Sequence, residues 1–373
     1  MNSRVAPGLI RDSIVAYLTA ADSASIAEIQ AAVVARVAGA PSSSIRSYLN
    51  LNTPELFERT ERGRYRLRRA KGVDSASSPV THRIGKACLV EANCLDWLQG
   101  RASSSIHAIV TDPPYGLLEY THGEQEKLRA GRGGVWRIPP SFDGCRRAPL
   151  PRFTVLSEGD LAAMHDFFFE FGKLALRVLT PGGNVLVASN PLLVHVVANA
   201  MSASGLELRG QLTRLVMTMR GGDRPKNAHE EFSDVSVMPR SMFEPWLILR
   251  RPLDGRVQDN LRKWRTGGFR RPCEDRPFGD VIKSSPTPRA EKQIAAHPSL
   301  KPQAFLREVV RAALPLGEGI VLDPFAGSGS TLAAANAVGY ESIGVEKDVR
   351  YVAVARAAIP KLAALNVKAI DPV

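Results

Sequence analysis

The chain carries the stretch Ile320-Val-Leu-Asp-Pro-Phe-Ala-Gly-Ser-Gly-Ser-Thr331, which predicts a buried strand, a glycine loop and the start of a helix. Gly327 and Gly329 let backbone N–H groups approach a ligand closely, and the amino end of a helix favours a carboxylate or phosphate. The next strand ends at Glu346, which is placed to accept both hydroxyls of a ribose. We therefore expect a nucleoside-type cofactor here, the alternative being a tight turn without a ligand. Leu332 stands where a dinucleotide fingerprint needs a third glycine, which disfavours NAD.

Strands and helices alternate on both sides of this stretch. Upstream, apolar runs predict strands at 86–90, 106–111 and 184–188, and a long helix at 160–179. Such alternation is typical of an α/β fold with an open, mostly parallel, doubly wound sheet of Rossmann type, covered on both faces. We expect this domain to span residues 84–373.

A second loop whose residues could take part in a reaction, Asp112-Pro113-Pro114-Tyr115, follows the strand at 106–111. It suits an exocyclic amine on a planar base, whose nitrogen lone pair is delocalised into the ring. A carboxylate and a backbone carbonyl that both accept from the amine would localise the lone pair, and prolines supply carbonyls without N–H donors. Tyr115 offers a flat face for the base. The alternative is a rigid surface turn.

Residues 1–70 predict a separate module, joined to the rest by a linker at 71–83. Three helices are expected at 10–19, 26–37 and 45–51, followed by a hairpin of strands at 56–60 and 65–67. This order resembles a winged helix-turn-helix domain. DNA contact would then come from the third helix and from Arg62 and Arg64 on the wing. The alternative is a protein-interaction or dimerisation module.

The overall composition favours a polyanionic partner. Among 373 residues, 49 Lys and Arg oppose 37 Asp and Glu, a net charge of +12, which makes nucleic acid the leading candidate. No apolar run approaches the roughly 18 residues of a membrane span, so we expect no membrane contact. The 4 cysteines have neither metal-site nor disulfide spacing. We expect a cytoplasmic, nucleoid-associated protein without a metal.

The two loops together resemble the S-adenosyl-L-methionine-dependent amino-methyltransferases of DNA. The catalytic loop precedes the cofactor loop by about 210 residues, as in the permuted β group of that family. His297-Pro-Ser-Leu-Lys-Pro302 is similar to the motif that precedes the cofactor site in that group. The resemblance covers roughly residues 84–360.

The resemblance implies a role for each matching residue. Lys301 would reach the carboxylate region of the cofactor, Glu346 its ribose, and Asn93 its adenine. Relatives tend to have Gly-Asp where this chain has Ala92-Asn93, which predicts weaker cofactor binding. His297 is expected in a motif or packing role. The residues around the methionine end would be Asp323, Pro324, Phe325, Gly327, Ser328, Gly329, Ser330 and Thr331.

The implied reaction is direct methyl transfer to N6 of an adenine flipped out of double-stranded DNA. Asp112 and the Pro113 carbonyl would polarise the amine, with Pro114 stiffening the loop and Tyr115 stacking on the base. Adenine is favoured because the Asp form of the motif is seen mostly with adenine. Alternatives are cytosine N4, an RNA or protein-amide substrate, or a non-catalytic DNA-binding regulator. A homodimer and a cognate restriction endonuclease are further partners left open.

Three basic segments outside the core are candidates for DNA contact. Residues 116–152 form a predicted flap with Arg132, and a run at 220–226 includes Arg224 and Lys226. Residues 251–292 occupy the position of the target-recognition segment in the β group, and basic residues interleaved with aromatic ones suit phosphate contact and stacking. Solvated surface loops are the alternative. The residues expected to contact DNA in 251–292 are Arg262, Lys263, Trp264, Arg265, Arg270 and Arg271.

Overall fold

The computed structural model describes residues 9–21, 23–37, 40–51, 53, 57–61, 63–67, 79–114, 141–142, 145–146, 158–216, 224–225, 228–295, 297 and 299–367. The chain divides into two compact units, Met1–Ser78 and Pro79–Val373. The division falls inside the predicted linker. The second unit begins earlier than residue 84, because β4 (Thr81–Ile84) already pairs with β5 (Ala87–Glu91) of its sheet.

The first unit contains the predicted helices and hairpin. Ser25 begins α2 with a capping box, in which its side chain accepts from Glu28 N and the Glu28 side chain accepts from Ser25 N. Ile14, Ile29 and Phe57 are fully buried in a core that belongs to this unit alone. In its described residues a three-stranded sheet has the order β1-β3-β2. The elements are α1 (Leu9–Ala21), β1 (Ala24–Ser25), α2 (Ile26–Arg36), α3 (Ser42–Leu51), β2 (Phe57–Glu61) and β3 (Arg64–Leu67).

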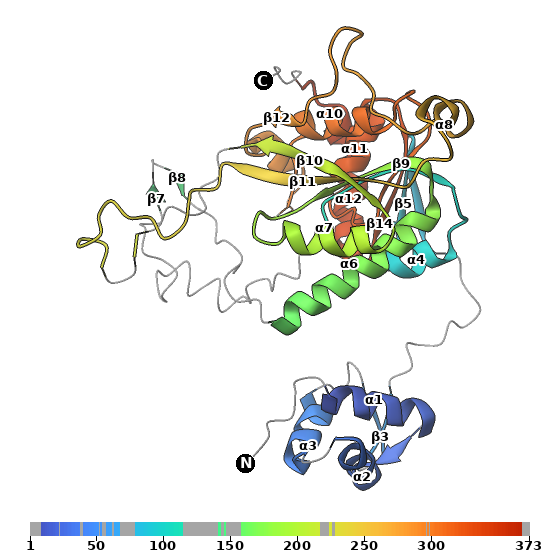
Figure 1. Ribbon diagram of the computed structural model, residues 1–373, viewed down its shortest axis with the longest axis vertical. Helices are drawn as coiled ribbons and strands as arrows, with labels where there is room; N and C mark the ends of the chain where they lie inside the picture. The colour runs from blue at the N-terminus through green and yellow to red at the C-terminus, as the bar shows by residue number, and fades with distance from the viewer. Residues whose placement is uncertain are drawn as a thin grey trace. The chain divides into compact units, whose positions relative to one another are not determined.

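The second unit is built on a sheet whose described strands run in the order β12-β10-β11-β9-β6-β13-β14-β5-β4 (Figure 1). Only β4 and β11 run against the other described strands of this sheet. The α/β fold with a mostly parallel sheet is thus confirmed. The remaining strands are β6 (Ile106–Thr111), β9 (Leu179–Ala188), β10 (Glu207–Leu215), β11 (Phe243–Arg250), β12 (Val281–Lys283), β13 (Ile320–Asp323) and β14 (Glu341–Glu346).

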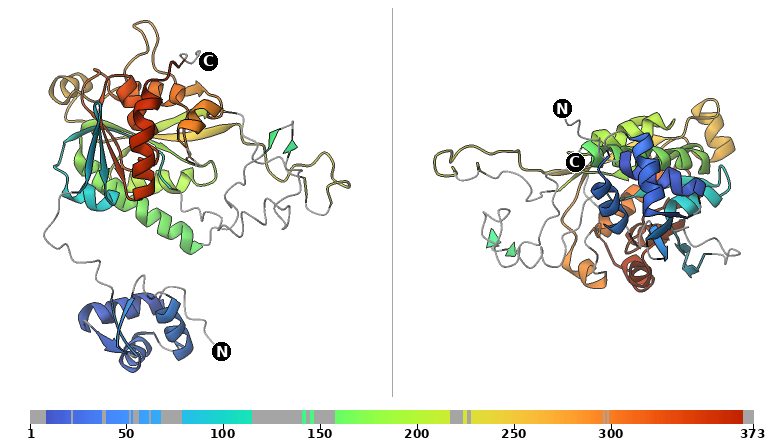
Figure 2. Two further views of the ribbon diagram at one scale, coloured as in Figure 1. Left: turned by 180° about the vertical axis from the view of Figure 1, so that it is seen from behind. Right: turned by 90° about the horizontal axis from the view of Figure 1, so that it is seen from below.

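Helices cover both faces of this sheet, because alternate strand residues face opposite sides. Ile109 and Leu322 pack into the core under α4, α6 and α7, whereas Val110 and Val321 pack under α10 and α11. These two groups of helices lie on opposite sides of the sheet (Figures 1 and 2). None of the described helices is long and apolar enough to cross a membrane. The helices are α4 (Cys94–Gly100), α6 (Glu158–Val178), α7 (Val194–Ala203), α8 (Val257–Trp264), α9 (Arg289–Ile294), α10 (Gln303–Ala313), α11 (Ser330–Ala337) and α12 (Val349–Ala363). A short ribbon, β7 (Ser141–Phe142) with β8 (Cys145–Arg146), lies apart from the sheet.

Strands β6 and β13 lie side by side in the middle of the sheet. Val321 pairs with Ala108 and Leu322 with Ile109, although these residues are more than two hundred positions apart in the chain. From β13 the chain continues into β14 on one side, while β6 lies on the other. Ligands of open α/β sheets bind at such a switch point, outside the carboxyl ends of the strands.

The predicted Pro181-Gly-Gly turn lies inside β9. The pairing of β6 with β9 jumps from Ile106–Leu179 to Ala108–Asn184, so the turn forms a bulge in the strand. The buried Asn260 side chain of α8 fills it and donates to Pro181 O at 2.9 Å. Because Asn260 is distant in sequence, nothing near the turn indicates that the strand continues through it.

Candidate active site

Asp112 directly follows β6, at the edge where the parallel strands end. Its side chain is 17% exposed, Pro113 is buried and Pro114 is exposed. Tyr115 lies outside the described residues. The predicted catalytic loop therefore begins at the carboxyl edge of the sheet, where its carboxylate is within reach of several neighbouring strands.

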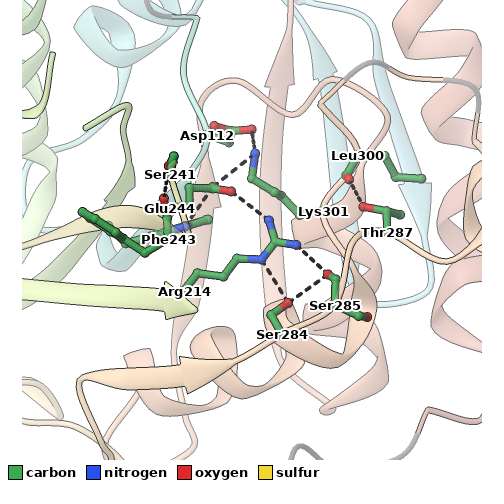
Figure 3. Close-up of polar contacts among 11 residues, drawn as sticks. Asp112, Arg214, Ser241, Phe243, Glu244, Ser284, Ser285, Thr287, Leu300 and Lys301 are labelled. Atoms are coloured by element: carbon green, nitrogen blue, oxygen red, sulfur yellow. Dashed lines mark hydrogen bonds and ion pairs between the residues drawn. The ribbon is translucent and has the colours of Figure 1, made fainter. Parts of the chain in front are cut away.

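Lys301 contacts Asp112. Its Nζ lies 2.5 Å from Asp112 Oδ2 and 3.4 Å from Glu244 Oε1 (Figure 3). Burial lowers the pKa of Lys301, but the charges of Asp112 and Glu244 outweigh this effect, and the pKa is raised overall. The resemblance assigned this lysine to the carboxylate region of the cofactor. In the structure its ammonium contacts two acidic side chains, those of Asp112 and Glu244.

Glu244 and Arg214 complete the polar cluster and were not predicted. They are register partners on β11 and β10, and Arg214 Nη1 donates to Glu244 Oε2 at 2.7 Å. Trp246 Nε1 donates to Glu244 Oε1 at 3.1 Å. Arg214 also donates to Ser284 Oγ at 3.0 Å and to Ser285 O at 2.9 Å (Figure 3). A glutamate in the mostly apolar strand β11 was the available signal, but its pairing with Arg214 becomes visible only with the strand order.

The neighbouring strand β13 ends at Asp323, which is 3% exposed. Its Oδ1 accepts from Thr111 Oγ1 at 2.7 Å and from Phe325 N at 3.1 Å. Burial raises the pKa of Asp323 to about 6. Thr111 immediately precedes Asp112, so this hydrogen bond joins the predicted catalytic loop at Asp112 to the glycine loop after β13.

The glycine loop adopts a backbone that requires glycine at two positions. Gly327 has φ +51° and Gly329 has φ +79°. A Cβ at Gly329 would lie 2.5 Å from Ile359 Cγ1, and one at Gly327 would lie 3.0 Å from His297 Nε2. His297 packs edge-on against Tyr351, with ring centroids 4.5 Å apart. This placement supports the packing role predicted for His297.

Glu346 and Asn93 continue the site along the same edge. Glu346 Oε2 accepts from Gly327 N at 2.9 Å, which fixes the carboxylate at the glycine loop. Asn93 follows β5, the neighbour of β14, and its side chain caps α4 by accepting from Leu95 N at 2.9 Å. Strands β13, β14 and β5 therefore present their predicted cofactor residues in the order that a methionine, a ribose and an adenine would need.

The remaining predicted cofactor residues follow β13 directly. Ser328 and Thr331 are buried, and Phe325 packs 5.6 Å from Phe171 between ring centroids. Ser330 O accepts from Gln303 Nε2 at 3.0 Å, which ties the start of α11 to α10. With Pro324, these residues surround the closely approached glycine backbone. A glycine cradle with a carboxylate at its end suits a nucleoside-type cofactor.

The predicted recognition residues of segment 251–292 lie elsewhere. Helix α8 packs at the amino end of β9, the opposite edge of the sheet from Asp112 (Figure 1). Lys263 pairs with Asp254 at 2.7 Å, and Arg262 with Asp259 at 3.3 Å.

The other residues of this group also bind within the protein. Arg265 pairs with Glu318 at 2.9 Å, Arg270 donates to Tyr340 Oη at 2.7 Å, and Arg271 donates to Glu274 O at 3.1 Å. Trp264 Nε1 donates to Asp254 Oδ2 at 3.0 Å. The structure does not bring these residues to the catalytic loop, because partners at the amino edge bind them.

The other predicted DNA contacts are only partly within the described chain. Arg224 is exposed between β10 and β11. Arg64 donates to Ser23 Oγ at 3.4 Å and lies 3.8 Å from Glu28. Arg62, Arg132 and Lys226, like most of the predicted flap at 116–152, lie outside the described residues.

Comparison with known families bears directly on this geometry. A family model described as DNA methylase matches residues 106–357, which include both loops. The chain belongs to this DNA methylase family. It is therefore a DNA N6/N4 methyltransferase, and S-adenosyl-L-methionine is its methyl donor.

Individual relatives are distant but extend over most of the second unit. The type II methyltransferase M2.DpnII of Streptococcus pneumoniae is 22% identical over 276 residues, covering 73% of this chain and 88% of the relative. M.HindIII of Haemophilus influenzae is 25% identical over 303 residues, covering 74% and 96%. Among solved structures, the cytosine-N4-specific PvuII DNA methyltransferase gives a TM-score of 0.47 at 15% identity, covering 76% and 88%. A DNA modification methylase of Thermus thermophilus, complexed with S-adenosyl-L-methionine, gives 0.45 at 20% identity, covering 74% and 94%.

Proposed function

We propose that this methyltransferase modifies N6 of an adenine that is flipped out of double-stranded DNA at a specific sequence. The observation that carries the proposal is the junction of the two loops, where Thr111 donates to Asp323 at 2.7 Å. An amine held by Asp112 would thereby lie next to the glycine loop that holds the methyl donor. The names of the type II relatives support a role in restriction–modification.

The catalytic loop acts by orienting and polarising the amine. When bound, S-adenosyl-L-methionine supplies an electrophilic methyl group on a sulfonium. The Asp112 carboxylate accepts one N–H of the amine, and the Pro113 carbonyl accepts the other. Together they localise the nitrogen lone pair and direct it at the methyl carbon, so positioning accounts for most of the acceleration. Asp112 would accept the proton that the nitrogen loses once the methyl group has left the sulfonium, whose sulfur keeps the electron pair of the broken carbon–sulfur bond.

The cofactor residues act by fixing the methyl donor. The Glu346 carboxylate would accept the ribose hydroxyls, and the amide group of Asn93 would contact the adenine. Asp323 stabilises the glycine loop by accepting hydrogen bonds from Thr111 Oγ1 and Phe325 N. These assignments predict that binding of the methyl donor depends on the glycine loop after β13 and not on Asp112.

The substitution Asp112→Ala tests the assignment. Methyl transfer should be abolished, because nothing then polarises the amine, while binding of S-adenosyl-L-methionine and DNA should stay within a few-fold of wild type. Radiolabelled methyl incorporation, calorimetry with the cofactor and DNA gel shifts measure the three properties. Transfer at near wild-type rates would rule out the mechanism. Mass spectrometry of nucleosides from the methylated DNA separates N6-methyladenine from N4-methylcytosine.

The first unit is proposed as a second DNA contact. Helix α3 exposes Ser44, Arg46, Ser47 and Asn50 on one side, while Ile45 and Leu49 face the core. Small polar residues and an arginine at an exposed helix surface suit contact with phosphates and base edges. Arg62 and Arg64 of the wing would add phosphate contacts.

A further inference from the structure

Lys301 lies between two carboxylates in a nearly dry environment. Its Nζ is 2.5 Å from Asp112 Oδ2 and 3.4 Å from Glu244 Oε1 (Figure 3). The side chains are 14%, 17% and 20% exposed for Lys301, Asp112 and Glu244. The ammonium is therefore within reach of two acceptors and bonded more closely to the catalytic one.

This arrangement conflicts with the role proposed for Asp112. A carboxylate that already accepts from an ammonium at 2.5 Å is a weaker acceptor for the N–H of a neutral amine. The ammonium is bonded to Asp112 Oδ2, one of the two oxygens that could accept from the amine. The lysine must therefore move away from Asp112 before the amine can be polarised.

Glu244 is held where it can receive the lysine. Arg214 binds its Oε2 at 2.7 Å, and Trp246 donates to its Oε1 at 3.1 Å. Arg214 is itself fixed by Ser284 and Ser285, and its guanidinium carbon lies 5.3 Å from the centre of the Phe305 ring. Glu244 is therefore held in place, and the lysine can shift from Asp112 toward it.

The charges of the cluster permit this shift. Burial raises the pKa of Glu244, but Lys301 and Arg214 outweigh it and lower the pKa overall, so Glu244 stays ionised. Lys301 and Arg214 balance Asp112 and Glu244 whether the ammonium is nearer one carboxylate or the other. No unpaired buried charge is created by the movement, which is the costly outcome for buried ion pairs.

We propose that Glu244 is a positioning residue that takes Lys301 from Asp112 when the target amine arrives. The proposal rests on the proposed function, since it gives Asp112 the task of accepting an amine N–H. Without Glu244 the lysine stays on Asp112 and competes with the amine. Loss of Glu244 should therefore slow methyl transfer without weakening the binding of cofactor or DNA.

The test compares Glu244→Gln with Glu207→Gln. Glu207 forms the other Arg–Glu pair between β10 and β11, with Arg250 at 2.6 Å, at the end of the strands remote from Lys301. Single-turnover methyl transfer should fall about ten-fold or more in Glu244→Gln and stay within about two-fold of wild type in Glu207→Gln. Calorimetry with S-adenosyl-L-methionine should give similar affinities for wild type and both variants.

Base extrusion supplies a readout that is independent of the amine. Duplex DNA with 2-aminopurine at the target position fluoresces when that base leaves the stack, and 2-aminopurine has no amino group at the position that meets Asp112. Its fluorescence with Glu244→Gln should equal that with wild type. A loss of extrusion equal to the loss of rate would instead make Glu244 a structural residue and overturn the proposal.

A double-mutant cycle separates the transfer of the lysine from a general loss of packing. If Glu244 acts by receiving the lysine, Glu244→Gln should cost little in a Lys301→Met background, because there is no ammonium to receive. Equal costs in both backgrounds overturn the proposal. Wild type is measured first, so an error in the proposed target base is detected separately from an error in the role of Glu244.

Discussion

Asp112 and Asp323 end neighbouring strands but lie in different surroundings. Asp112 is partly exposed and paired with Lys301 at 2.5 Å. Asp323 is buried and bound only by hydroxyl and amide donors in the contacts described above, and burial raises its pKa to about 6. Asp112 thus pairs with the ammonium of Lys301, whereas Asp323 stabilises the glycine loop at an electrostatic cost above pH 6.

The cost at Asp323 predicts a pH-dependent gain from Asp323→Asn. Its folded pKa of about 6 lies above the ordinary 3.8, so its contribution to stability is complete below pH 3.8 and is lost as the pH rises through 6. The difference corresponds to about 3 kcal/mol at pH 8. An asparagine keeps the Oδ1 acceptor without the charge, so the variant should exceed wild type in free energy of unfolding by up to that amount.

Urea unfolding of both proteins at pH 4, 6 and 8 measures this gain. The comparison at each pH cancels the titration of other groups. The advantage of Asp323→Asn should be near zero at pH 4 and largest at pH 8. A difference that is the same at all three pH values would show that folding does not raise the pKa of Asp323.

Residues at strand ends could be predicted from sequence, whereas cross-strand partners could not. Asp112 and Glu346 each follow an apolar run, and parallel strands bring such ends to one edge. Glu244 and Arg214 meet because β11 lies beside β10 in a particular register. That register also decides the position of Lys301, which sequence reasoning assigned to the cofactor. The pairing of strands in the folded protein therefore determines the positions of Glu244, Arg214 and Lys301, which the motifs do not indicate.

At the scale of elements, the glycine loop is defined by backbone conformation and by contact with α12. Gly329 and Gly339 both have positive φ, +79° and +83°. A Cβ added at Gly329 would have a neighbour within 4 Å, whereas a Cβ added at Gly339 would not. Gly339→Ala should cost about 1–2 kcal/mol of unfolding free energy from backbone strain alone. Gly329→Ala should cost more, because Ile359 must also move.

Cofactor affinity distinguishes the two glycine variants further. Gly329→Ala should weaken binding of S-adenosyl-L-methionine about ten-fold or more, while Gly339→Ala should leave it within about two-fold, since Gly339 lies at the other end of α11. Calorimetry and urea unfolding supply the two measurements. Equal affinities in both variants would exclude Gly329 from the cofactor site.

Helix α8 shows how a residue predicted from its charge can also have a partner within the protein. Its arginine and lysine residues predicted contact with phosphates, and in the structure Lys263 has an acidic partner at 2.7 Å. The helix is held at the amino edge by Asn260, which is fully buried and donates to Pro181 O and Thr266 O. A buried asparagine in an otherwise basic amphipathic helix was the local sign of a structural role.

At the scale of the whole molecule, the two units have separate hydrophobic cores. Ile14, Ile29 and Phe57 belong to one core, and no residue of Pro79–Val373 is included in it. Independent cores predict independent unfolding. Calorimetric scans should therefore show two transitions, and Ile29→Ala should lower only one of them by a few degrees or more.

A fragment of residues 79–373 tests the same independence by function. It should fold, bind S-adenosyl-L-methionine with unchanged affinity and methylate DNA at saturating concentrations, because both loops lie within it. Its affinity for DNA should be lower than that of the full chain if the first unit contacts the duplex. A fragment that fails to bind the cofactor would show that the second unit needs the first.

The pairing of β6 with β13 determines when this protein can become stable during synthesis. A ribosome releases β6 long before β13 exists, so the central position of the sheet stays vacant until Ile320–Asp323 has emerged. Until then Val110 and Ile109 have apolar surface and backbone groups that lack their final neighbours, a state prone to aggregation. The nascent chain thus depends on its last helices and strands to close the core, and premature termination after α10 should produce a client for chaperones and proteases instead of a smaller enzyme.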